Sequence, residues 1–220
     1  MKDLNRMIEH TNLKPILTDR DINRMVEQAI EHQFVGLCLP PFWIKKASRD
    51  LERQDIQLVT VVGFPLGYQM TETKLEEIKI AMGNGADELD IVMNLSAFKS
   101  GMPWVKIELA KCAKLIHEAH KIMKIIIETA YLSDEEVIQA CGLCKDAGAD
   151  FVKTSTGFAP QGATVDHIRL MRQTLPSQVG IKASGGIKTY HDAMALIKVG
   201  ADRLGTSSGL AIMAEIEQQP

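Results

Sequence analysis

The stretch Gly148-Ala149-Asp150-Phe151-Val152-Lys153 joins the end of a helical period to a short apolar run, and its first three residues occur three times in the chain. The same Gly-Ala-Asp tripeptide stands at positions 85–87 and 200–202, and each copy precedes a strand-like run within a few residues. Glycine at such a junction suits a helix that ends in a left-handed turn, and the apolar run is typical of a buried strand. The repetition predicts a series of alternating helices and strands.

Eight strand-like segments alternate with eight helical ones along the whole sequence. The expected strands cover residues 7–11, 34–39, 58–63, 88–93, 124–128, 151–154, 179–183 and 203–205. The expected helices cover residues 19–32, 42–52, 71–84, 103–120, 134–146, 165–174, 190–199 and 210–217. Thr18, Thr71 and Ser133 each stand ahead of acidic residues, as hydroxyl groups that cap helix starts do.

Eight such units favour a TIM (β/α)8 barrel over an open doubly wound sheet, because no Gly-x-Gly-x-x-Gly follows the first strand. We expect one domain over residues 1–220, with an extra N-terminal segment. The weakest of the expected strands is the first, Met7 to Thr11, which is short and polar at its end.

Charge and cysteine usage exclude several classes of function. The 220 residues hold 25 Lys and Arg against 28 Asp and Glu, a net charge of −3, so a nucleic-acid partner is not expected. We expect no membrane partner, because the sequence has neither a run of about 20 apolar residues nor a signal-peptide core. Four cysteines in a chain of this length are not a disulfide scaffold, which favours a cytoplasmic protein.

Two short motifs are interpreted as structural. Cys141 and Cys144 form a CxxC, but a second cysteine pair is lacking and both fall on one face of an expected helix, so we interpret them as core. His117 and His120 lie on a helix without an obvious third ligand, and we interpret them as part of a solvent-exposed helix. No metal and no cofactor are expected.

Polar residues gather where the expected strands end, which is where active sites of such barrels lie. They are Glu9 and Thr11, Cys38, Asp90 and Asn94, Glu128, Lys153, Lys182, and Ser207 beyond the last strand. For Cys38 a small core residue is the default interpretation. An inward Asp90 in an apolar run needs a partner, which Lys153 and Lys182 would provide.

Lys153 and Lys182 lie on consecutive expected strands. A single strand-end lysine more often packs its aliphatic stem with its head in solvent, but two neighbours suggest imine chemistry. At about 6 Å and an effective dielectric of about 20, two ammonium groups repel by roughly 3 kcal/mol, or about two pKa units. Repulsion and desolvation would thus make one lysine a neutral amine near neutral pH, although Asp90 opposes this and the arithmetic leaves open which lysine it is.

The expected loops after strands seven and eight indicate a phosphate site. Residues 184–189 and 205–209 are rich in glycine and serine and lead into helices, so their backbone N–H groups can surround an anion. One such loop would be a weak signal, but two adjacent ones make a bound phosphate the better interpretation.

Five blocks together resemble the deoxyribose-phosphate aldolases, a family of class I (Schiff-base) aldolases with a TIM-barrel fold. The blocks are residues 9–15, 63–67, 84–90, 151–157 and 182–186. The resemblance implies that Lys153 forms the imine, that Lys182 perturbs it and that Asp90 relays protons. It also implies a phosphate cradle made by Gly157, Gly185, Gly186, Gly205, Ser207 and Ser208.

The reaction implied by this resemblance is the reversible cleavage of 2-deoxy-D-ribose 5-phosphate to acetaldehyde and D-glyceraldehyde 3-phosphate. Its partners would be a small phosphorylated sugar and acetaldehyde, and a homo-oligomer, dimer or tetramer, is expected. The chain departs from the family pattern at Glu9, where an Asp is usual. It ends at residues 217–220 without the tyrosine tail of some longer members, so we expect no proton-transfer contribution from such a tail and a lower turnover.

Two alternatives stay open at this point. A phosphate-binding sugar-phosphate epimerase or isomerase would use metal ligands or a glutamate base instead of lysines. A non-catalytic phosphosugar-binding barrel would keep the phosphate loops alone.

Overall fold

The computed structural model describes residues 3–52 and 54–217. Its eight strands are β1 Ile8–Thr11, β2 Gly36–Cys38, β3 Gln57–Val62, β4 Glu88–Val92, β5 Ile122–Ile126, β6 Phe151–Lys153, β7 Gly180–Ser184 and β8 Arg203–Thr206. Each strand pairs in parallel with the next, and β8 pairs with β1, so the sheet is a closed barrel. The expected TIM barrel is confirmed, including its weakest strand.

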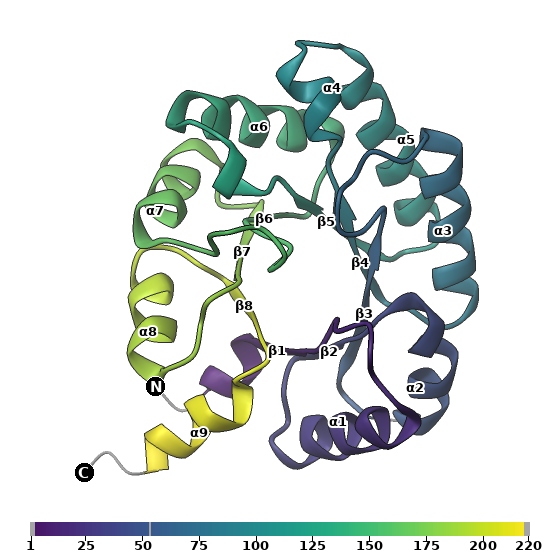
Figure 1. Cartoon of the computed structure of the whole chain (residues 1–220), viewed down its shortest axis with the longest axis vertical. Coiled ribbons are helices and arrows are strands. Elements are labelled where there is room, and N and C mark those ends of the chain that lie inside the picture. The colour runs from purple at the N-terminus through teal and green to yellow at the C-terminus, as the bar shows by residue number, and fades with distance from the viewer. Residues whose placement is uncertain (1–2, 53, 218–220) are drawn as a thin grey trace.

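Helices surround the strands on the outside of the ring (Figure 1). They are α1 Asp19–Glu31, α2 Ile44–Asp50, α3 Thr71–Gly83, α4 Leu95–Lys99, α5 Trp104–Glu118, α6 Asp134–Ala147, α7 Val165–Thr174, α8 Tyr190–Lys198 and α9 Gly209–Glu217. Three 3-10 helices, η1 Leu4–Met7, η2 Pro41–Trp43 and η3 Thr129–Tyr131, complete the described elements. None of the helices in the described part of the chain is long and apolar enough to cross a membrane.

Two of the three expected helix caps are confirmed. Thr18 and Ser133 form capping boxes with the acidic residues three positions later. The third is wrong, because Thr71 is already the first residue of α3 and its hydroxyl donates to Glu108 at 3.0 Å. Glu108 also pairs with the buried Lys74 at 2.6 Å, so the Thr71 hydroxyl completes a buried polar cluster and does not cap its own helix.

The three Gly-Ala-Asp tripeptides have the expected backbone conformation. Gly85, Gly148 and Gly200 have φ angles of 103°, 93° and 116°, in the left-handed region that glycine adopts without strain. Each aspartate then accepts a hydrogen bond from the backbone N–H of the preceding strand: Asp87 from Leu58, Asp150 from Met123 and Asp202 from Ile181, at 3.0, 2.8 and 2.8 Å. We call these three aspartates the rim aspartates, since they join neighbouring strands at the rim where the strands begin.

Replacing the rim aspartate Asp150 with alanine is expected to lower the free energy of unfolding by about 1–3 kcal/mol, because the N–H of Met123 loses its acceptor. Turnover should stay within about twofold, since the change lies at the opposite end of the strands from the candidate site. Denaturant unfolding would measure the first effect. Asp146→Ala, which removes a carboxylate bonded to exposed lysines, is the matched control and should cost less than about 0.5 kcal/mol.

The barrel wall and the helices bury a continuous apolar core. Cys141 and Cys144 lie within it, so their interpretation as core residues is confirmed, and all four cysteines are free and buried. The Nε2 atom of His117 lies 2.9 Å from the carboxylate of Asp150, and its side chain is partly exposed, as expected for a surface helix.

The described structure differs from the expected elements mainly after β4 and β5. The short helix α4 follows Asn94, which is not on a strand: its side chain accepts from the N–H of Ala97 and so begins the helix. Glu128, expected at the end of the fifth strand, lies outside the sheet, because β5 ends at Ile126 and Glu128 has φ 49°, a left-handed conformation. The sequence does not predict α4, because its five residues show too little apolar periodicity to be recognised beside the longer α5.

Candidate active site

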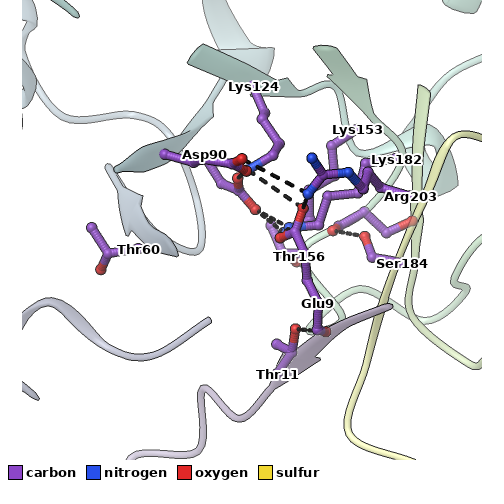
Figure 2. A network of polar contacts seen from close by, with 12 residues as sticks. Glu9, Thr11, Thr60, Asp90, Lys124, Lys153, Thr156, Lys182, Ser184 and Arg203 are labelled. Carbon is purple, nitrogen blue, oxygen red and sulfur yellow. Dashed lines mark hydrogen bonds and ion pairs between the residues drawn. The ribbon is translucent and has the colours of Figure 1, made fainter. Parts of the chain in front are cut away.

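Seven charged side chains converge inside the barrel: Glu9 from β1, Glu88 and Asp90 from β4, Lys124 from β5, Lys153 from β6, Lys182 from β7 and Arg203 from β8. All of these side chains except Glu88 are labelled in Figure 2. Six of them are buried, and Arg203 is partly exposed. The register accounts for this convergence, because Asp90 pairs with Lys124, Lys153 with Lys182, and Lys182 with Arg203 in the sheet. Residues that pair on neighbouring parallel strands point to the same face.

Asp90 is the centre of this cluster. Its Oδ2 atom accepts from the Nζ atoms of Lys153 and Lys182, both at 2.7 Å, and its Oδ1 atom accepts from Lys124 at 3.1 Å. Burial opposes the charge on Asp90, but the three ammonium groups outweigh it and hold the pKa of Asp90 well below its usual range. Asp90 therefore faces inward and has the lysine partners expected of it.

Lys153 and Lys182 differ in their surroundings although they share one carboxylate oxygen. Lys182 also donates to Glu9, so it lies between two carboxylates. Burial acts to lower the pKa of Lys182, yet Asp90 and Glu9 together raise it above its ordinary value. Lys182 is therefore held as the charged ammonium. Because the Nζ atoms of Lys153 and Lys182 each lie 2.7 Å from the same oxygen of Asp90, the two nitrogen atoms are separated by at most twice that distance.

Glu9, which stands where the family usually has the shorter Asp, contacts Lys182. Its Oε2 atom accepts from Lys182, and its Oε1 atom lies 3.5 Å from Lys124. The longer side chain fits because residue 36 on the adjacent strand is glycine: a Cβ there would lie 3.2 Å from the Cγ atom of Glu9. Burial alone would raise the pKa of Glu9, but Lys124 and Lys182 lower it below its ordinary value.

Three members of the charged cluster were missed from the sequence. Lys124 ion-pairs with Glu88, and Arg203 lies 3.8 Å from Glu88 and over the ring of Phe151. A usable signal was the alternation on β4, since Glu88 lies two residues before Asp90 and so shares its face. With every group ionised, the seven side chains carry four positive and three negative charges.

A cavity of about 400 Å³ opens beside this cluster. Among the described residues, Lys153 lines this cavity, whereas Lys182 and Asp90 do not. All six residues expected to bind phosphate line the cavity too: Gly157, Gly185, Gly186, Gly205, Ser207 and Ser208. The structure thus brings Lys153 together with the glycine and serine loops that stand at separate strand ends in the sequence.

The glycine and serine loops bring left-handed glycines and the start of a helix to the cavity. Gly185 and Gly186 follow β7 with φ angles of 83° and 77°, and the Ser207-Ser208 turn leads directly into the N-terminus of α9. A helix N-terminus and turns of this kind present N–H groups to an anion. Lys14 and Lys188 also line the cavity and were not singled out in the sequence.

Two strand-end residues have structural roles. The hydroxyl of Thr11 donates to the carbonyl oxygen of Glu9 in its own strand. Cys38 is buried among Val59 and Val61, and burial raises the pKa of its thiol to about 11, so it is a thiol at neutral pH. The default interpretation of Cys38 as a core residue is confirmed.

Comparison with known proteins adds relatives that match over nearly the whole chain. A family profile described as "DeoC/LacD family aldolase" matches residues 3–215. The chain is 47% identical over 214 residues to a protein of Thermococcus gammatolerans named deoxyribose-phosphate aldolase, covering 96% of this chain and 95% of the relative. It is 48% identical over 212 residues to a protein of that name from Streptococcus gordonii, with 96% and 95% covered.

A solved structure shares the same fold. The deoxyribose phosphate aldolase of Aeropyrum pernix, described as having a unique tetrameric structure, superimposes with a TM-score of 0.92 at 32% sequence identity. The match covers 99% of this chain and 92% of that one.

Proposed function

This chain belongs to the DeoC/LacD family of aldolases, and from that membership and the geometry of the cavity we propose that it reversibly cleaves 2-deoxy-D-ribose 5-phosphate through an imine at Lys153. It is a carbon–carbon lyase whose products are acetaldehyde and D-glyceraldehyde 3-phosphate. One observation supports the assignment most directly: of the two lysines bonded to the same oxygen of Asp90, Lys153 is the one that lines the cavity.

Lys153 is the nucleophile in this proposal because the neighbouring Lys182 is held as an ammonium by two carboxylates. Lys182 keeps its proton between Glu9 and Asp90, so Lys153 is the amine of the pair that reaches the cavity. A neutral amine at Lys153 adds to the substrate aldehyde, and loss of water gives the iminium. The iminium then draws the electrons of the breaking carbon–carbon bond and leaves the enamine of acetaldehyde.

Asp90 and Lys182 serve the proton transfers at the methyl carbon of that enamine. Asp90 contacts both nitrogen atoms, so it orients Lys153 and can relay a proton by way of a water molecule. Return of a proton to the enamine carbon gives the iminium of acetaldehyde, and its hydrolysis restores the free Lys153.

The phosphate of the substrate would bind to Gly157, Gly185, Gly186, Gly205, Ser207 and Ser208, at loops of the same cavity. Backbone N–H groups and the N-terminus of α9 compensate its charge there, and Lys14 and Lys188 add positive charge to the walls. The phosphate is bound at a distance from the reacting bond, and this binding positions the aldehyde carbon C1 of the substrate beside Lys153.

Replacing Gly185 with alanine is expected to raise the KM for deoxyribose 5-phosphate at least about tenfold with a smaller change in kcat. An alanine there meets a φ of 83°, and its Cβ would lie 3.0 Å from the Cα atom of Gly162, so the loop has to shift. Steady-state kinetics with unphosphorylated deoxyribose should show almost no change in KM. Gly142→Ala, within α6 and with free space around the added methyl, is the matched control. Equal effects on both substrates would contradict the phosphate assignment.

Treatment with acetaldehyde and borohydride tests the aldolase reaction itself. The expected result is an ethyl group on Lys153, located by peptide mass spectrometry, together with release of acetaldehyde from deoxyribose 5-phosphate. A sugar-phosphate epimerase or isomerase would give neither result. A non-catalytic phosphosugar-binding barrel would bind deoxyribose 5-phosphate equally well after Lys153→Leu and would release no acetaldehyde.

We further propose that the chain acts as a single domain in the cytoplasm, as a homo-oligomer, without a nucleic-acid partner. Four free buried cysteines and the net charge of −3 support the location and the lack of a nucleic-acid partner. The tetrameric relative supports the oligomer, as do the exposed Met70 and Trp104 near the starts of the adjacent helices α3 and α5. Light scattering distinguishes a dimer or tetramer from a monomer.

A further inference from the structure

Glu128 is a buried carboxylate whose hydrogen bonds come from an uncharged residue. It is 3% exposed, and it accepts from the backbone N–H of Thr156 at 3.1 Å and from the Thr156 hydroxyl. Glu9, Glu88 and Asp90, by contrast, each form an ion pair with a lysine within 4.0 Å. The backbone of Glu128 is in the left-handed region, a conformation that side chains other than glycine and asparagine adopt rarely and mostly at functional positions.

The Thr156 hydroxyl connects Glu128 to the cavity. A hydroxyl has one proton and two acceptor lone pairs. The proton goes to Glu128, and one lone pair accepts from the backbone N–H of Phe158 at 3.1 Å. Thr156 lines the same cavity as Lys153, so the second lone pair is available to a hydroxyl group of a bound molecule.

Cleavage of a β-hydroxy iminium requires such an acceptor. The carbon–carbon bond breaks as the hydroxyl on the departing carbon loses its proton and becomes the new aldehyde. Asp90 suits this proton poorly, since it lies behind the cavity wall and its pKa is held well below the usual range by three lysines. Burial, in contrast, raises the pKa of Glu128, although the Thr156 hydrogen bonds and the charge of Lys153 act to lower it. Lys153 and Thr156 are the groups that face this carboxylate.

We propose that Thr156 takes the proton of the substrate hydroxyl on the carbon that leaves, while passing its own proton to Glu128. The inference rests on the proposed aldolase function. In this step the substrate O–H bond and the carbon–carbon bond break, the new carbonyl forms, and the electron pair of the carbon–carbon bond enters the iminium to give the enamine. Thr156 ends with a hydroxyl again, and Glu128 carries the proton until the aldol direction or solvent removes it. Thr156 is a catalytic residue, and Glu128 is a positioning residue that holds the proton through it.

Three variants test the relay. Thr156→Val and Glu128→Gln should each lower kcat for cleavage of deoxyribose 5-phosphate by about 10²-fold or more, with KM changed less than about threefold. Thr156→Ser keeps the hydroxyl and should retain activity within about tenfold. Thr174→Val and Glu118→Gln, which alter a threonine and a glutamate far from the cavity, are the matched controls and should leave kcat unchanged.

A pH profile separates the relay from a merely structural role. In the native protein, kcat for cleavage should fall as the pH drops through the pKa of Glu128, because the protonated carboxyl cannot accept. In Glu128→Gln that acidic limb should be missing and the rate low throughout. A rise in KM with an unchanged pH profile, or unaltered kcat in both Glu128→Gln and Thr156→Val, would overturn the proposal.

Acetaldehyde trapping keeps this inference distinct from the aldolase assignment. Formation of the imine from acetaldehyde involves no such hydroxyl, so borohydride should label Lys153 of Glu128→Gln and Thr156→Val at the native extent. Labelling with native cleavage rates would overturn the relay and leave the aldolase function in place. Loss of labelling in the native protein would overturn the aldolase function.

Discussion

Replacing Lys153 with leucine is expected to reduce cleavage of deoxyribose 5-phosphate by more than about 10⁴-fold and to abolish borohydride labelling by acetaldehyde. No other amine in the described part of the cluster lines the cavity at this point, since Lys124 and Lys182 are turned into the carboxylates behind it. The protein should still fold, because Asp90 keeps Lys124 and Lys182 as partners.

Lys153→Arg is the sharper companion variant. A guanidinium stays charged at any pH at which the protein is folded, so it can keep the contact to Asp90 but cannot form an imine. We expect it to be as inactive as the leucine variant and more stable. Lys114→Leu, at an exposed position on α5, is the control for the loss of a lysine elsewhere. Native labelling of either Lys153 variant would place the imine on another residue.

Replacing Lys182 with leucine is expected to lower kcat by about 10²-fold or more while inorganic phosphate binds with nearly unchanged affinity. The substitution removes the ammonium group that repels a charge on Lys153 and leaves Asp90 and Glu9 with fewer partners. Phosphate should be little affected because Lys182 lies behind the cavity wall. Comparable turnover in this variant would refute the electrostatic argument for Lys153.

The same variant should lose about 3–5 kcal/mol of unfolding free energy, the usual cost of removing one partner from a buried ion pair. The pKa of Lys182 is raised on folding, so its contribution is fully present below its unfolded pKa of about 10.4 and disappears as the pH rises through the folded value. The pKa values of Asp90 and Glu9 are lowered, so their contribution is present above about pH 4 and disappears at lower pH. The difference between native and variant protein should therefore be constant from pH 6 to 9.

A second substitution separates stability from catalysis. Glu9→Gln in the Lys182→Leu background removes the charge of a carboxylate that has lost its closest ammonium partner, and it should restore part of the unfolding free energy. It should not restore turnover, because no cation returns beside Lys153. Recovery of both together would show that Lys182 acts only by supporting the fold.

The barrel itself could be predicted because its signals are local. Gly148 marks the end of a helix, and Asp150 stands directly before the next strand. The spacing of apolar residues then predicts whether each segment between such junctions is a helix or a strand. Lys153 and the loop glycines could be predicted because in this fold each lies at the end of a strand or directly after it. The single-domain organisation and the assigned roles of the site residues stay predictions.

The features that sequence reasoning missed depend on register and on distant partners. Lys124 pairs with Asp90 only through the alignment of β4 with β5, which no local pattern fixes. Thr71 resembles a helix cap because an acidic residue follows it, whereas its actual partner, Glu108, lies 37 residues away and is not visible in the local sequence. Glu128 resembled a strand residue because its left-handed backbone is supported by contacts to Thr156 in another loop. The expectation about the C-terminal tail concerns residues 218–220, which lie outside the described residues.

The rim aspartates stabilise the end of the barrel that lies opposite the cavity. Asp87, Asp150 and Asp202 also contact basic side chains: Lys121 at the entry to β5, His117 of α5 and Arg172 of α7. These contacts join strands and helices at the end remote from the cavity. Exposed side chains around the cavity, such as Phe158, can therefore be exchanged to admit new aldehydes while the barrel beneath them keeps its shape.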